Sequence, residues 1–158
     1  MRLIYFFTLP SWYHGTFVFF PILPNMENLQ KKGMKKKFEL EYILNTSLGV
    51  LFDRLATPGG LAEWFADDVN IDGDILTFFW ENNQEQAEIL NLKDNKMIRM
   101  KWLDDKFAKS YLEFKVGQDE LTGDTSLYIT DFAEEGEIKE AINLWDSQVS
   151  ELKRALGL

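Results

Sequence analysis

The chain has 158 residues, no cysteine, one histidine and a formal net charge of −9. This length suits one domain that can bury a core without disulfides, and the absence of thiols excludes disulfide and thiolate metal sites. The body of the chain contains no cluster of basic residues, so we expect neither nucleic acid nor an anionic membrane surface as a partner. We also expect no cofactor and no metal.

The first part of the chain, residues 1–33, differs from the rest, since residues 1–24 are rich in aromatic residues and nearly free of charge. Three interpretations remain open: a start codon assigned too early, a signal or anchor segment, and a genuine extension. The first is favoured because Met34 is followed by three lysines and a regular alternating pattern. Residues 34–158 carry 14 basic and 25 acidic side chains and lack the histidine, His14. We therefore expect a cytoplasmic domain over 34–158.

Three short elements are predicted at the start of this domain. Apolar and charged residues alternate over 38–44, which predicts a half-buried strand. Ser47 is a suitable N-cap for a short helix over 47–55. A second short helix is predicted over 57–65, because a threonine followed by Pro58 is typical of the N-cap and first position of a helix.

A run of strands with short connections follows these helices. Asp-Gly, Asn-Asn and Asp-Asn pairs mark the turns between apolar alternations, and such short turns favour antiparallel pairing. The predicted strands cover 68–72, 75–81, 84–92, 97–103, 109–116 and 125–132.

A long amphipathic helix is predicted over 135–156. Its apolar residues recur at helical spacing, acidic residues lie near its start, and Gly157 follows as a stop signal. The order of strand, two short helices, meander and long helix predicts an α+β helix-grip fold. In this fold a curved antiparallel sheet of about six to seven strands wraps around the C-terminal helix.

The segments 38–42, 55–58 and 61–65, together with the Asp-Gly hairpin and the closing helix around Trp145, carry a family resemblance. On these residues the chain resembles the START-like (SRPBCC) helix-grip superfamily, in the branch related to activators of the heat-shock chaperone ATPase. The resemblance covers 34–158, and the compact form is similar to that of small bacterial members. It implies a cavity between sheet and helix that suits lipids or other apolar small molecules. The chain departs from those activators in lacking their separate chaperone-docking N-terminal domain, which argues against that activity.

Large apolar side chains on the inner side of the predicted sheet and helix are the candidate lining of this cavity, although a filled core would use the same residues. The candidates are Trp64, Phe65, Phe78, Trp80, Ile89, Met100, Trp102, Phe114, Ile129, Ile142, Trp145 and Val149.

Catalysis is not expected. The carboxylates considered for an acid–base pair are Glu81, Glu85, Glu88 and Asp131. Strand alternation places Glu81 and Glu88 on the wet face, and Asp131 falls at the end of a predicted strand. We therefore expect a small soluble domain that binds a hydrophobic small molecule or lipid. The alternatives are a protein-interaction module of the co-chaperone kind and a cyclase-like enzyme.

Overall fold

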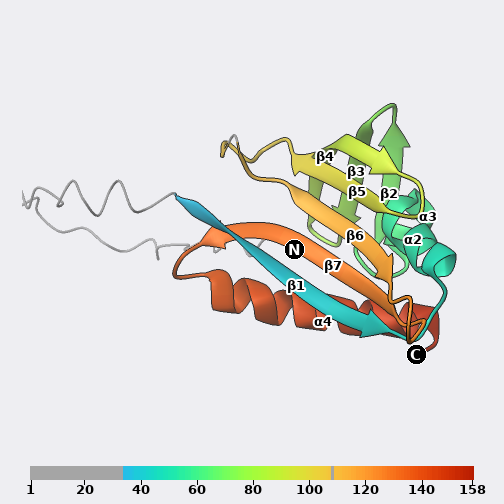
Figure 1. The fold of residues 1–158 in the computed structure, drawn as a ribbon. Coiled ribbons are helices and arrows are strands. Elements are labelled where there is room, and N and C mark those ends of the chain that lie inside the picture. Colours follow the sequence, from blue (N-terminus) through green and yellow to red (C-terminus); the bar gives the residue numbers. More distant parts are fainter. Residues whose placement is uncertain (1–33, 108) are drawn as a thin grey trace, which may run out of the picture. The chain divides into compact units, whose positions relative to one another are not determined.

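Seven strands form one antiparallel sheet in the order β1-β7-β6-β5-β4-β3-β2 (Figure 1). The computed structural model describes residues 34–107 and 109–158, so the expectations for residues 1–33 lie outside it. Lys35–Leu158 form one compact unit. The strands are β1 (Lys35–Leu44), β2 (Asp68–Asp72), β3 (Ile75–Trp80), β4 (Asn83–Lys93), β5 (Met97–Trp102), β6 (Leu112–Gln118) and β7 (Thr125–Glu134). The helices are α2 (Leu48–Ala56), α3 (Pro58–Ala62) and α4 (Ile138–Leu156). The predicted α+β helix-grip architecture is confirmed.

The two short helices follow β1 and are capped as predicted. The Ser47 side chain accepts a hydrogen bond from the amide of Val50 at the start of α2. The Thr57 hydroxyl oxygen accepts from the amide of Gly60 at 3.0 Å and so caps α3, with Pro58 at the first helical position.

The helix α3 ends three residues earlier than predicted. The amides of Trp64, Phe65 and Ala66 all donate to the carbonyl of Leu61, at 3.4, 2.8 and 3.3 Å. This tight turn replaces a further helical turn. As a result, Trp64 and Phe65 follow each other into the core rather than lying on one helix face.

Gly60 allows α2 and α3 to approach closely. A Cβ atom at this position would lie 2.2 Å from the carbonyl oxygen of Asp53 and 2.7 Å from the Cα of Arg54, both of them backbone atoms. A Cβ at the neighbouring Gly59 would meet nothing within 4 Å. The second glycine of the pair is therefore required by packing, and the first is not.

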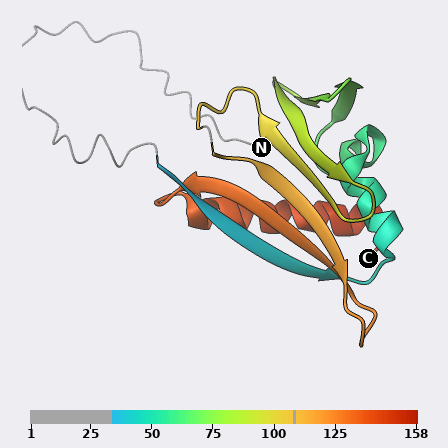
Figure 2. The same ribbon diagram turned by 45° about the horizontal axis from the view of Figure 1, so that its top comes forward.

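The helix α4 lies along β1 and β7, whereas α2 and α3 lie on the same face of the sheet but beside β2, β5 and β6 (Figures 1 and 2). It begins at Ile138, three residues later than predicted, because Glu134–Glu137 forms a turn closed by a 2.8 Å backbone hydrogen bond. It ends at Gly157, which adopts a left-handed conformation with φ of 75°.

The strand alternation agrees with the predicted inner and outer faces, but some bounds differ. β6 begins at Leu112 instead of residue 109, because Asp105 accepts hydrogen bonds from Phe107 and Ser110 and so orders the preceding loop. β7 continues to Glu134, two residues past its predicted end. In β4 the register shifts between Ile89 and Asn91, which marks a β-bulge.

Candidate functional site

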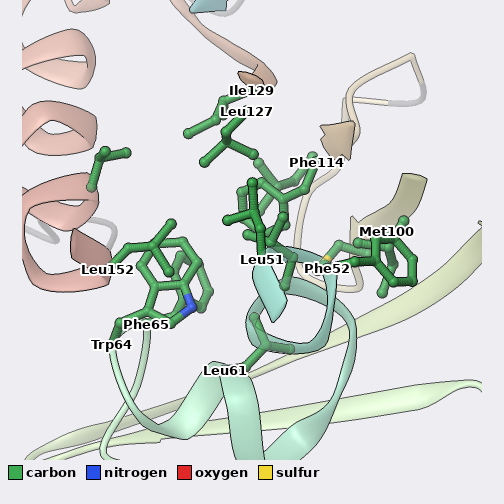
Figure 3. Close-up of a cluster of buried hydrophobic side chains, with 14 of the residues drawn as sticks. Leu51, Phe52, Leu61, Trp64, Phe65, Met100, Phe114, Leu127, Ile129 and Leu152 are labelled. Atoms are coloured by element: carbon green, nitrogen blue, oxygen red, sulfur yellow. The ribbon is translucent and has the colours of Figure 1, made fainter. Parts of the chain in front are cut away.

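The inner side of the sheet carries a cluster of aromatic rings with Phe65 at its centre. Figure 3 shows Phe65 beside Trp64, close to α2 and the inner side chains of the sheet. The Phe65 ring stacks on Trp145 of α4, with centroids 6.0 Å apart and planes inclined by 12°. It also lies within 6.4 Å, centroid to centroid, of the rings of Trp64, Phe78, Trp80, Trp102 and Phe114. One residue from the turn after α3 thus joins the sheet to the C-terminal helix.

Hydrogen bonds fix the orientation of three of the indole rings. The Nε1 of Trp64 donates to the carbonyl of Arg54 at 2.9 Å, and the Nε1 of Trp80 donates to the carbonyl of Phe65 at 3.0 Å. The Nε1 of Trp145 donates to Asp131 Oδ2 at 3.0 Å. Each ring therefore keeps an apolar face toward the cluster while its polar edge is satisfied.

Eleven of the twelve candidate lining residues belong to one hydrophobic cluster on the inner side of the sheet or pack against it. The other one, Ile142, lies on α4 three residues before Trp145. Eight are buried: Trp64, Phe65, Phe78, Met100, Phe114, Ile129, Trp145 and Val149. Four are only partly buried, and these are Trp80, Ile89, Trp102 and Ile142. The interior therefore has a filled aromatic centre and an apolar margin that solvent reaches.

Asp131 faces the interior, a position that was not predicted from the sequence. Because β7 continues past it, Asp131 follows Leu127 and Ile129 on the inner face at alternate positions. Its Oδ1 accepts from the amide of Phe132 at 2.8 Å, and its Oδ2 accepts from Trp145. Burial raises the pKa of this carboxyl above its usual value, although the two N–H donors oppose that effect. The predicted strand over 125–132 contained Asp131, so alternation from Leu127 and Ile129 was the signal for its inward position, but only its place near the strand end was considered.

Two further polar groups lie on the inner side. Gln148 follows Trp145 by three residues on α4, and its Oε1 is buried without a hydrogen-bond partner. Glu85 of β4 is partly buried and directly opposite Phe78, and its Oε1 accepts from Asn83 at 3.2 Å. Asp131 and Gln148 therefore have acceptor oxygens that are buried or bonded to the aromatic cluster, whereas the hydrogen bond of Glu85 is at an exposed position.

Two features would allow metal binding or membrane insertion: a group of metal-ligating side chains and a helix able to span a membrane. Within 34–107 and 109–158, no three His, Cys, Asp or Glu side chains are grouped closely enough to hold a metal ion. No helix in the same residues has the length and apolar character needed to cross a membrane. The Asp68–Asp72 segment, with its spaced acidic residues, is the first strand of a hairpin, in which Gly73 turns with φ of 58°.

Comparison with known proteins gives one family and several similar structures. The model of the START-like superfamily domain matches residues 32–158. Among solved structures, BfR322 from Bacteroides fragilis is 46% identical, with a TM-score of 0.59 over 78% of this chain and 93% of that protein. None of the curated proteins is detectably similar to this chain.

Two more distant structures share the fold. The Aha1 dimer from Colwellia psychrerythraea is 16% identical, with a TM-score of 0.65 over 77% of this chain and 96% of that one. The AHSA1-like protein from Aeromonas hydrophila is 12% identical, with a TM-score of 0.63 over 77% and 92%. At these identities the likeness concerns the architecture alone.

Proposed function

The chain belongs to the START-like superfamily, and from this premise we propose that it is a binding module for a hydrophobic small molecule or lipid. The ligand would lie between the sheet and α4. The lining would be the twelve apolar residues described above, with the aromatic cluster around Phe65 as its floor. The domain would act in the cytoplasm and without catalysis.

The observation that carries this proposal is the apolar margin of the interior. Trp80, Ile89 and Trp102 on the sheet and Ile142 on α4 are large apolar side chains that remain partly exposed although they face inward. An apolar molecule that covered them would remove this area from water, at about 25 cal/mol per Å². Pockets for small molecules have this composition, with few polar groups among many apolar ones.

The two inner carboxylates lie on strands that are not adjacent. Glu85 lies on β4 and Asp131 on β7, and β5 and β6 separate the two strands. Adjacent strands are about 4.8 Å apart, so the two backbones are separated by about 14 Å across the sheet. Paired carboxylates in glycosidases lie about 5–9.5 Å apart. This separation supports binding rather than acid–base chemistry.

Native mass spectrometry of the protein purified from its own cells would test the proposal. We expect extra mass that is lost on denaturation and that belongs to an apolar compound. Ile142→Gln, which places a polar group on the margin, should lower the retained fraction. Ile43→Gln is the matched control, because Ile43 is 65% exposed on β1. A protein that is always bare, and that binds no apolar probe in solution, would contradict the proposal.

A second candidate function is binding of a protein partner through the outer face of the sheet. There the Arg99 guanidinium lies 4.3 Å from the centre of the Tyr111 ring and pairs with Glu113, and Tyr111 meets Phe132 at 5.0 Å. A partly exposed aromatic and an arginine are residue types typical of interfaces. Tyr111→Ser should then abolish a complex while leaving the binding of apolar probes intact.

A further inference from the structure

The charged side chains on the inner face of the described sheet are mostly acidic. By strand alternation the acidic ones are Glu85 and Asp131, and the basic one is Lys36, the second residue of β1. Lys36 is exposed and bonds to Glu135 at 2.5 Å, so its charge is already paired at the rim. The whole chain adds to the same field, since its net charge is −9. An anion entering this site would therefore meet a negative potential.

Asp131 is the polar group best placed to meet a ligand. It lies directly opposite Phe38 of β1, a partly buried residue that packs against the core, and it bonds to Trp145 of the aromatic cluster. Its two oxygens each accept one bond, from Phe132 and from Trp145. A carboxylate has about four lone-pair sites, so capacity remains for a further donor.

Gln148 points to the same kind of ligand group. Its buried Oε1 has no donor among the described residues, and a buried acceptor without a donor is costly. Gln148 stands one helical turn beyond Trp145, the residue that holds Asp131. Near Trp145 the interior therefore presents the Asp131 carboxylate, which can accept a further hydrogen bond, and the Gln148 amide oxygen, which has no donor among the described residues.

We propose that the ligand of this site carries a hydrogen-bond donor at its polar end, preferably a protonated amine, which the Asp131 carboxylate binds while the apolar body covers the aromatic margin. Fatty acids and other anionic lipids would be excluded. This inference rests on the proposed binding function and adds the chemical class of the head group. Burial raises the pKa of Asp131, and the hydrogen bonds from Phe132 and Trp145 and the positive charge of Lys35 offset this only in part, so a cationic ligand group would stabilise the carboxylate further.

The test compares three probes with the same apolar body, decylamine, decanol and decanoate, by isothermal titration calorimetry of the full chain at pH 7. We expect decylamine to bind at least about tenfold more tightly than decanoate, because only the amine can form a charge-assisted hydrogen bond with the Asp131 carboxylate. Asp131→Asn should remove this preference. Glu140→Gln should keep it, because it removes one negative charge from an exposed position on α4, away from the Asp131 carboxylate of β7.

Each outcome decides between the proposals. Equal binding of all three probes would overturn the head-group inference and leave the binding function standing. Tighter binding of decanoate would do the same. No binding of any probe would overturn both. If both Glu140→Gln and Asp131→Asn lose the preference for decylamine, the preference comes from the general negative charge of the surface. That result would also overturn the inference.

A second variant guards against misfolding of Asp131→Asn. Trp145→Phe removes the indole donor from Asp131 Oδ2 but keeps the carboxylate charge. All three probes would bind less tightly, because an aromatic contact is smaller. The ratio of decylamine to decanoate affinity should nevertheless stay at or above its wild-type value. A folded Trp145→Phe protein in which this ratio falls to one would overturn the inference.

Discussion

The rings of Phe65 and Trp145 are stacked with centroids 6.0 Å apart and planes inclined by only 12°, although the two residues are 80 positions apart in the sequence. Phe65 reaches this place from the turn after α3, and Trp145 from the middle of α4. The stack is the point at which the two sets of helices on one face of the sheet meet through side chains. The stability of the fold should therefore be sensitive to this pair.

Phe65→Ala should lower the free energy of unfolding by about 3–5 kcal/mol, because it leaves a cavity among six aromatic neighbours. Phe79→Ala is the matched control, since Phe79 lies on the outer face of β3 and is partly exposed. We expect it to cost about 1–2 kcal/mol. Urea denaturation measures both values, and equal costs would show that Phe65 is not the centre of the core.

Gly60→Ala should destabilise the protein by at least about 2 kcal/mol, because the added Cβ must displace the backbone of α2. Gly59→Ala should be neutral or stabilise it by up to about 1 kcal/mol, because alanine is the better helix former and meets no atom there. Thermal unfolding of the two variants compares one methyl group at adjacent positions. Similar melting temperatures would mean that α2 and α3 can separate without cost.

Asp105 should make the protein less stable in acid. Partial burial raises the pKa of this carboxyl, but hydrogen bonds from Lys35, Ser110 and the amide of Phe107 outweigh it and lower the pKa to about 2. A depressed pKa stabilises the folded state above the unfolded value near 3.8, and the gain is lost as the pH falls toward 2. The shift corresponds to about 2 kcal/mol.

Asp105→Asn should remove that loss, so that its unfolding free energy depends less on pH between about 4 and 2. Asp104→Asn, at an exposed position of the same turn, is the control. Chemical denaturation at a series of pH values measures both. If the two variants show the same pH dependence as the wild type, the Lys35–Asp105 pair at 2.6 Å contributes nothing to it.

Tyr42 should make the stability of the protein depend on pH in alkaline solution. Burial and the hydrogen bond that its hydroxyl donates to Asp146 at 2.7 Å raise the pKa of this phenol above its usual value near 10. The folded state then keeps a proton that the unfolded state loses, so stability falls as the pH rises above about 10. Tyr42→Phe should flatten this decline, whereas Tyr128→Phe, on the outer face, should not. Absorbance of tyrosinate during the pH titration would detect a Tyr42 that ionises normally.

The local chemistry of the sequence was sufficient to predict most of the fold. Ser47 and Thr57 cap their helices, and the Asp72-Gly73 pair turns a hairpin, because these interactions involve residues close in the chain. The end of α3 and the start of β6 were wrong by three residues. In both places a hydrogen-bonded turn competes with a regular element, and hydrophobic periodicity does not report that competition.

The candidate site was predictable in kind but not in arrangement. Alternation identified the apolar inner face, yet it could not show that Phe65 lies among rings from three strands and α4. The inward position of Asp131 was not predicted, because the contact that holds it there is with the indole of Trp145, 14 positions later in the chain. Contacts between distant segments decide such positions, and a single sequence carries no direct signal for them.

The pairing of β1 with β7 has a consequence for synthesis on the ribosome. Its partners stand about 80–100 positions apart in the chain, from Leu44 with Thr125 to Lys35 with Glu134. At about 5–20 residues per second, β1 waits roughly 4–20 seconds before its partner strand exists. During that interval the apolar side chains of β1 can contact exposed hydrophobic surfaces of other molecules in the cell. The nascent chain is thus most vulnerable to aggregation just before its last helix emerges, and truncated products would share that hazard permanently.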